Sequence, residues 1–117
     1  MYGLFTVVHD ALHGTFARDR RLNDALGAAG LLLLAPHASL GFFRWAHMQH
    51  HRHTNAAADP DRWSHEGGLT LPLRWATIDL AYAAHALRRG DAAARRHLLG
   101  VLPRVAATLA VVALLAH

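Results

Sequence analysis

Histidine is the residue type whose number and spacing in this chain could support chemistry. The sequence holds eleven histidines in 117 residues, and five of them fall into two spaced clusters. The first cluster, HDALHG, contains His9 and His13, and the second, HMQHHRHTN, contains His47, His50 and His51. Positions i, i+3 and i+4 of a helix share one face. Each cluster is therefore expected to direct its imidazoles from one helical face toward a common point.

Imidazoles gathered in this way are typical of a metal site. Imidazole binds iron, copper, nickel and zinc, and the sequence has no cysteine to compete for the metal. Two metal ions of ordinary coordination number need about eight donors or more, whereas the two clusters supply five. We predict a histidine-ligated metal site that needs further donors. Zinc binds the same ligands without redox chemistry, and the residues alone leave it open.

Two aspartates near the second cluster are candidates for supporting the ligands. Metal-bound imidazoles usually donate their other N–H to a carboxylate or a carbonyl. Asp59 and Asp61 flank a proline in a polar segment that can fold back on the cluster. Asp10 adjoins His9 but is expected to point elsewhere on its helix. We therefore prefer Asp59 and Asp61 to Asp10 as hydrogen-bond partners of the metal ligands.

The other histidines are expected to be structural or exposed. His53 lies about 120° around the helix from His47 and so leaves the ligand face. His37 follows a proline in an apolar bend, where packing is the expected role. The isolated histidines are His65, His85, His97 and His117.

Composition excludes several function classes. The length and the apolar content of 53% suit one small domain. Without cysteine the chain has no disulfide and no thiolate site. All twelve basic residues are arginines, scattered in ones and twos among apolar stretches. A nucleic-acid interface would show a basic patch or stripe, so we expect no nucleic-acid partner.

The elements that must position the clusters are expected to be helices. Residues 1–16 predict a helix with the first cluster near its end, and residues 44–54 predict a helix that carries the second. Residues 17–23 predict a charged turn in which Asn23 could cap the next helix. Residues 24–43 contain two apolar pieces split by proline and glycine, which favours a re-entrant or interfacial hairpin over a full membrane span.

The second half of the chain is expected to contain a loop, a surface helix and a terminal apolar helix. Residues 55–68 predict a polar loop, and residues 73–89 predict an amphipathic helix lying on a membrane surface. The apolar run 105–116 is shorter than the roughly twenty residues that span a bilayer, which indicates a helix cut short. The expected fold class is all-α, with membrane-embedded helices, a short apolar hairpin and cytoplasmic histidine-box helices.

The clusters and their surroundings resemble the histidine boxes of the membrane fatty-acid desaturase and hydroxylase superfamily. An HxxxH box is followed about thirty residues later by an HxxHH box, and then by TN and by Asp59-Pro60-Asp61. The HDA-x-HG form of the first box and the RLNDALG after it are also similar to the carotenoid ketolase branch. The resemblance runs from about Val7 to the end of the chain.

The resemblance implies that residues 1–117 are a partial fatty-acid desaturase-like domain, truncated at both ends. In the superfamily a third box, usually another HxxHH, lies beyond two further membrane helices. That box has no counterpart here, nor does most of the first hydrophobic hairpin. This chain alone is therefore expected to show no turnover.

The function implied by the resemblance is oxygen-dependent oxidation of lipid. The boxes would hold two iron ions, with dioxygen as co-substrate, a membrane lipid or acyl chain as substrate, and a ferredoxin or cytochrome as electron donor. An all-imidazole ligand set leaves the charge on the metals high, which favours a centre oxidising enough to attack an unactivated C–H bond. TN after the second box favours acyl chains. A carotenoid ketolase or hydroxylase and a non-catalytic metal-binding membrane protein remain alternatives.

The arginines also predict an orientation. All twelve lie between the first box and the last apolar run, and cytoplasmic segments of membrane proteins carry an excess of Lys and Arg. We therefore expect both boxes on the cytoplasmic side of a bacterial inner membrane.

Overall fold

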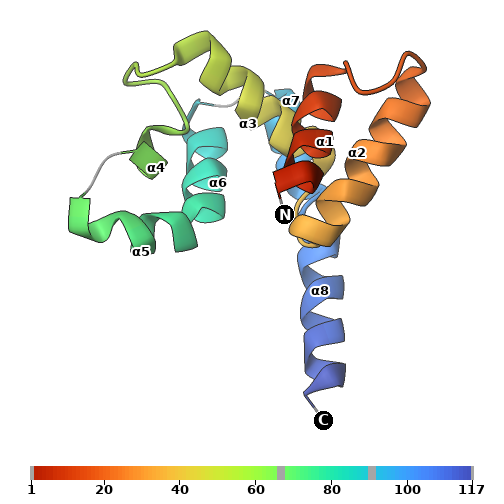
Figure 1. Ribbon diagram of the computed structural model, residues 1–117. Helices are drawn as coiled ribbons and strands as arrows, with labels where there is room; N and C mark the ends of the chain where they lie inside the picture. The colour runs from red at the N-terminus through yellow and green to blue at the C-terminus, as the bar shows by residue number, and fades with distance from the viewer. Residues whose placement is uncertain (1, 66–67, 90–91, 117) are drawn as a thin grey trace. The chain divides into compact units, whose positions relative to one another are not determined.

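Helices are the only regular secondary structure among the residues described by the computed structural model, which are 2–65, 68–89 and 92–116. No strand occurs in these ranges (Figure 1), so the predicted all-α fold is confirmed. In chain order the elements are α1 (Tyr2–His13), α2 (Arg20–Leu34), α3 (Leu40–His53), α4 (Arg62–His65), the 3-10 helix η1 (Gly68–Thr70), α5 (Leu71–Ala76), α6 (Ile78–Arg89), α7 (Ala92–Leu99) and α8 (Leu102–Leu115).

The chain divides into two compact units. The first unit comprises residues 1–44 and 99–117, and the second comprises residues 45–98. Helix α3 begins in the first unit and ends in the second as one continuous helix.

In the first unit, α1 and α2 pack closely because α2 presents glycines to α1. A Cβ added at Gly27 would lie 2.5 Å from the Cβ of Ala11, and one added at Gly30 would lie 3.0 Å from a methyl group of Val8. Val8 and Ala11 are both fully buried. The two glycines, one turn apart, are therefore required for this close approach.

A small apolar core extends from this contact. Val8, Leu12 and Leu31 are buried together, and Leu40 and Phe43 pack against them from the start of α3. Burial of each such side chain contributes roughly 1.5–3 kcal/mol. The core therefore fixes the end of α1 that carries the first histidine box.

The capping role predicted for Asn23 is wrong. Helix α2 begins at Arg20, and the Asp19 carboxylate caps it by accepting a hydrogen bond from the Leu22 amide at 2.7 Å. Asn23 is instead buried and donates its side-chain amide to the carbonyl oxygen of Ala11 at 3.0 Å. The last carbonyls of a helix have no intrahelical partner, so Asn23 satisfies the end of α1 rather than the start of α2.

The second apolar piece of the predicted hairpin is the first turn of the box helix. Helix α3 begins at Leu40, four residues before the predicted start. The Ser39 hydroxyl accepts a hydrogen bond from the Phe42 amide at 3.2 Å, which is how a serine caps a helix N-terminus. Residues 40–43 therefore belong to α3 and do not form a separate element.

In the second unit, the single amphipathic helix predicted over residues 73–89 is wrong. Thr77 separates α5 from α6, and its hydroxyl donates to the Leu73 carbonyl oxygen at 2.8 Å. The indole of Trp63, on α4, donates to the Arg74 carbonyl oxygen at 3.0 Å. These contacts occupy carbonyls at the end of α5. The predicted loop also differs, because it contains the four-residue helix α4.

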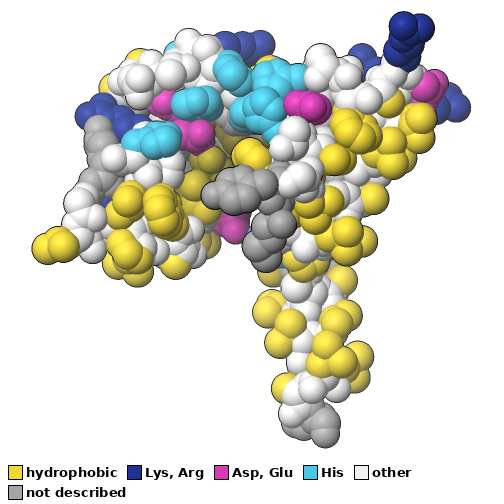
Figure 2. Space-filling model, viewed as in Figure 1, with side chains coloured by type: hydrophobic (Ala, Val, Ile, Leu, Met, Phe, Trp, Pro, Cys, Tyr) yellow, Lys and Arg dark blue, Asp and Glu magenta, His cyan; other side chains and the backbone are white. Residues whose placement is uncertain are grey.

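Large apolar side chains of η1, α5 and α6 face solvent. Leu69, Leu73, Trp75 and Leu80 are all exposed, and Figure 2 shows hydrophobic side chains gathered over α5. An amphipathic helix with leucine and tryptophan on one side suits the interface of a membrane.

A membrane-spanning candidate lies at the C-terminal end of the described residues. Ala92–Leu115 spans 24 residues with a mean hydropathy of 2.2 in its most apolar stretch, which is long and apolar enough to cross a bilayer. None of the described residues of α8 is buried. The candidate span is therefore longer than the run 105–116 indicated by the sequence.

Candidate metal centre

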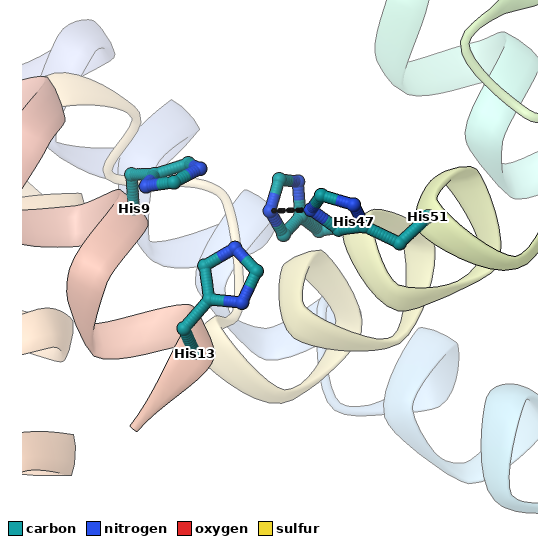
Figure 3. A group of neighbouring side chains, drawn as sticks. All are labelled: His9, His13, His47 and His51. Carbon is teal, nitrogen blue, oxygen red and sulfur yellow. Dashed lines mark hydrogen bonds between the residues drawn. The ribbon is translucent and has the colours of Figure 1, made fainter. Parts of the chain in front are cut away.

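The first histidine box lies in the last turns of α1. The ring centroids of His9 and His13 are 4.7 Å apart, as expected for positions one turn apart (Figure 3). Helix α1 ends at His13, and Gly14 follows with a φ of +75°, a conformation that glycine adopts at no steric cost. The first two predicted ligands therefore share one helical face.

Asp10 does not point away from the box as expected. Its carboxylate oxygen lies 3.3 Å from Nδ1 of His9. Both side chains are partly exposed, so the contact is open to water. Asp10 nonetheless belongs among the carboxylates that touch a predicted ligand.

The second box lies in the last turns of α3. The Nε2 atoms of His47 and His51 are 3.1 Å apart and their rings meet edge to face (Figure 3). Two ring nitrogens at this separation either share one proton or bind one cation. Metal–nitrogen bonds of about 2.0–2.1 Å at tetrahedral or octahedral angles place neighbouring nitrogens about 2.8–3.4 Å apart. The observed separation fits two ligands of one ion.

His50 lies on the same helix and meets the two predicted aspartates. Its Nδ1 is 2.9 Å from an oxygen of Asp59 and 3.5 Å from an oxygen of Asp61. Each of the three residues offers a ligand atom within 4.8 Å of the others. The structure thus brings together His50, Asp59 and Asp61, whereas their roles at a metal remain predictions.

Asp59 is held as a charged hydrogen-bond acceptor. Its side chain is only 1% exposed and accepts hydrogen bonds from the amides of Asn55 and Asp61, both at 2.8 Å. Burial alone would raise the pKa of Asp59, but the hydrogen bonds from His50 and from these amides outweigh burial and lower the pKa below 3.8. A carboxylate can only accept, so Nδ1 of His50 carries the proton and Nε2 is left to bind a metal.

Asn55 ends the box helix in the way that allows this contact. It has a φ of +60°, the left-handed conformation that asparagine tolerates after a helix. The chain therefore turns back immediately after α3 and returns Asp59 to His50.

Arg44 binds the end of α1 from within α3. Its guanidinium donates to the carbonyl oxygens of Leu12 at 3.1 Å and Ala11 at 2.8 Å, and to the Asp24 carboxylate at 2.6 Å. The hydrogen bond from Arg44, followed by that from Asn23, lowers the pKa of Asp24 below its usual value. A cation is favourable at a helix C-terminus, and these contacts hold the start of α3 against the end of α1.

Two residues that lie beside the second box were not predicted from the motifs of the sequence. The ring of His65, on α4, has its centroid 6.5 Å from that of His50. The hydroxyl of Tyr82, on α6, donates a hydrogen bond to Asp61. Neither residue belongs to a spaced motif, so only the folded second unit reveals them.

The other histidines lie elsewhere. His53 and His85 line a cavity of about 520 Å³ in the second unit together with Trp45. Burial lowers the pKa of His85, and the nearby cations of Arg89 and Arg88 lower it further, so this ring is neutral at pH 7. His37 is half-buried in the turn after α2, His97 is exposed, and His117 lies outside the described residues.

Comparisons with known proteins agree with the resemblance that the two boxes carry. The family model described as fatty acid desaturase matches residues 1–117. Similar proteins include zeaxanthin 4-ketolase of Chlamydomonas reinhardtii, 40% identical over 68% of this chain and 18% of that protein. Beta-carotene ketolase of Paracoccus sp. (strain PC1) is 40% identical over 62% of this chain and 28% of its own length.

A lipid desaturase is also similar. The sn-1 oleoyl-lipid 12-desaturase of Anabaena variabilis is 36% identical over 52% of this chain and 17% of its own length. No solved structure matches the chain. The matches thus cover between 17% and 28% of these relatives. Because the family model covers the whole sequence, the chain belongs to the fatty acid desaturase family.

Proposed function

We propose that this chain carries two histidine boxes of an oxygen-dependent, non-haem diiron oxidoreductase that acts on a membrane lipid. The observation that carries the proposal is the pair of Nε2 atoms of His47 and His51, 3.1 Å apart in a chain matched throughout by the desaturase family. That separation suits two ligands of one ion. All ligands of the boxes are imidazoles, and iron is one of the metals that imidazole binds.

We further propose that His9 and His13 share the centre with His47, His50 and His51. Support comes from Arg44, which binds carbonyls directly before His13. His47 follows Arg44 by three residues on the continuous helix α3, which is a rise of about 4.5 Å. We therefore expect the second box to meet the first.

The residues of the chain have defined tasks in this proposal. Bound iron would activate dioxygen and supply the oxidising power for C–H cleavage. Asp59 fixes the proton of His50 on Nδ1 and so aims Nε2 at the centre. The imidazoles bind as neutral ligands and leave the positive charge of the metal uncompensated, which favours a strongly oxidising centre.

A carotenoid is the substrate that the comparisons favour. The similar carotenoid ketolases are 38–42% identical over 62–70% of the chain, whereas the 12-desaturase is 36% identical over 52%. An acyl lipid is the second candidate, supported by TN after the second box and by the match to the desaturase.

Expression of the full-length protein in a bacterium that makes β-carotene tests both candidates. Oxygenated carotenoids would support the first substrate, and new double bonds or hydroxyl groups in acyl chains would support the second. Unchanged carotenoids and unchanged acyl chains, in cells whose membranes contain the iron-loaded protein, would contradict the proposed function.

The electron donor and the orientation complete the proposal. Iron-dependent oxidation of this kind needs electrons, for which a ferredoxin or a cytochrome is the proposed source. The twelve arginines between the first box and the last apolar run support a cytoplasmic location of the boxes at a bacterial inner membrane. Labelling of single cysteines placed at exposed Arg52 from either side of the membrane tests the orientation.

A further inference from the structure

We propose that Tyr82 is a positioning residue for His50 and acts through Asp61. This inference rests on the proposed metal-binding role of His50. Tyr82 lies on α6, is 8% exposed, and donates its hydroxyl hydrogen bond to one oxygen of Asp61. The contact joins residues 21 positions apart and lies wholly within the second unit.

The hydroxyl determines which way the Asp61 carboxylate faces. Tyr82 binds Oδ1 of Asp61, and the other oxygen, Oδ2, lies 3.5 Å from Nδ1 of His50. A carboxylate with one oxygen fixed by a buried donor has little freedom to rotate. Tyr82 therefore keeps Oδ2 turned toward the imidazole.

Asp61 needs this donor more than Asp59 does. Asp59 has two backbone amides as donors in addition to His50. Asp61 has the longer contact with His50, and its side chain is 22% exposed. Two carboxylates that face one N–H repel each other, and the Tyr82 hydroxyl stabilises the charge of the second.

Tyr82 is suited to remain a donor. Burial raises the pKa of its phenol, and the hydrogen bond and charge of Asp61 raise it further. The hydroxyl therefore stays protonated throughout the neutral range. Its ring also fills a buried position on α6, so Tyr82→Phe removes the donor and keeps the packing.

Removal of the Tyr82 hydroxyl should therefore lower the affinity for metal. Loss of a direct hydrogen-bond partner of a metal-bound histidine typically lowers metal affinity about 10–100-fold. Tyr82 acts one contact further away, so we expect Tyr82→Phe to lower iron affinity by about 3–10-fold. Asp61→Ala should lower it at least as much.

The test is iron(II) retention against a graded chelator in the full-length protein, with thermal unfolding measured in parallel. Tyr82→Phe should release iron at a lower chelator concentration than the unmodified protein. In an Asp61→Ala background, Tyr82→Phe should have no further effect, because a residue that acts through Asp61 cannot act without it. An equal effect in both backgrounds, or none in either, would overturn the inference.

Two controls separate this inference from the proposed function. Trp75→Phe removes the indole that donates to the Ser64 carbonyl oxygen at 3.1 Å in the same unit and should leave iron retention unchanged. A loss of iron in Trp75→Phe equal to that in Tyr82→Phe would overturn the specific role of Tyr82. His50→Ala tests the metal site itself. If His50→Ala keeps its iron, the proposed function fails; if it loses iron while Tyr82→Phe and Asp61→Ala retain it, only the role of Tyr82 fails.

Discussion

Replacement of Asp59 by alanine should lower both the stability of the second unit and its affinity for metal. The change removes the acceptor of three hydrogen bonds, from Nδ1 of His50 at 2.9 Å and from the amides of Asn55 and Asp61 at 2.8 Å. A hydrogen bond to a charged group contributes about 1.5–3 kcal/mol. The freed amides can reach water once the side chain is gone, so we expect a total loss of about 2–4 kcal/mol in the free energy of unfolding.

The effect on metal follows from the orientation of His50. Loss of the partner that fixes the proton on Nδ1 should lower iron affinity about 10–100-fold, which corresponds to about 1.4–2.8 kcal/mol. The assay is denaturant unfolding together with iron retention of the full-length protein. Asp59→Ala should remain partly active and iron-depleted, whereas His50→Ala and His51→Ala should abolish activity.

A matched control distinguishes this effect from general loss of a capping carboxylate. Asp19→Ala removes the carboxylate that accepts from the Leu22 amide in the first unit. It should cost about 1 kcal/mol of stability and leave iron affinity unchanged. Asp59→Ala with the iron affinity of the unmodified protein would refute the reasoning about His50.

The remaining predictions concern the helices and the titrating groups. Arg44→Ala should lower iron content, because the carbonyl oxygens of Ala11 and Leu12 lose the guanidinium that ties α3 to α1; iron content equal to that of the unmodified protein would contradict this role. Gly27→Ala should lower the melting temperature more than Gly30→Ala, because its Cβ would lie 2.5 Å rather than 3.0 Å from the nearest atom; the reverse order would contradict the packing. Because the pKa of Asp59 is lowered in the folded state, its charged carboxylate stabilises the fold above the unfolded pKa of 3.8, and this stabilisation is lost as the pH falls through the folded pKa. The stability difference between the unmodified protein and Asp59→Asn should therefore shrink in unfolding experiments as the pH falls through this range. His85→Gln should keep near-normal iron content by metal analysis, and a loss as large as that of His50→Ala would show that His85 supports the centre.

The positions of the boxes on helices could be predicted from the sequence because helical periodicity is local. Spacings of three and four residues place His47, His50 and His51 on one side of α3 whatever surrounds them. The return of Asp59 to His50 was also predictable, since Asp59 lies in the polar loop that closely follows the box helix.

Contacts between distant residues could not be predicted in the same way. Asparagine often caps helices, but the side-chain amide of Asn23 donates to a buried carbonyl oxygen of α1 once α1 and α2 pack. In the sequence, Arg44 is one of several scattered arginines. Only the fold shows that it donates hydrogen bonds to carbonyl oxygens more than thirty positions earlier. In the sequence, Tyr82 occupies an apolar position of an amphipathic helix. Only the break at Thr77 and the packing of α6 reveal its hydrogen bond to Asp61. Each of these depends on tertiary structure that no short pattern records.

We propose that both histidine boxes bind the same metal centre. A crystal structure of the full-length, iron-loaded protein, with the iron located from its anomalous scattering, is the direct measurement. We predict ring nitrogens of both His13 and His47 about 2.0–2.2 Å from iron within one dinuclear centre. Iron bound by the second box alone, with His9 and His13 outside its coordination sphere, would contradict it.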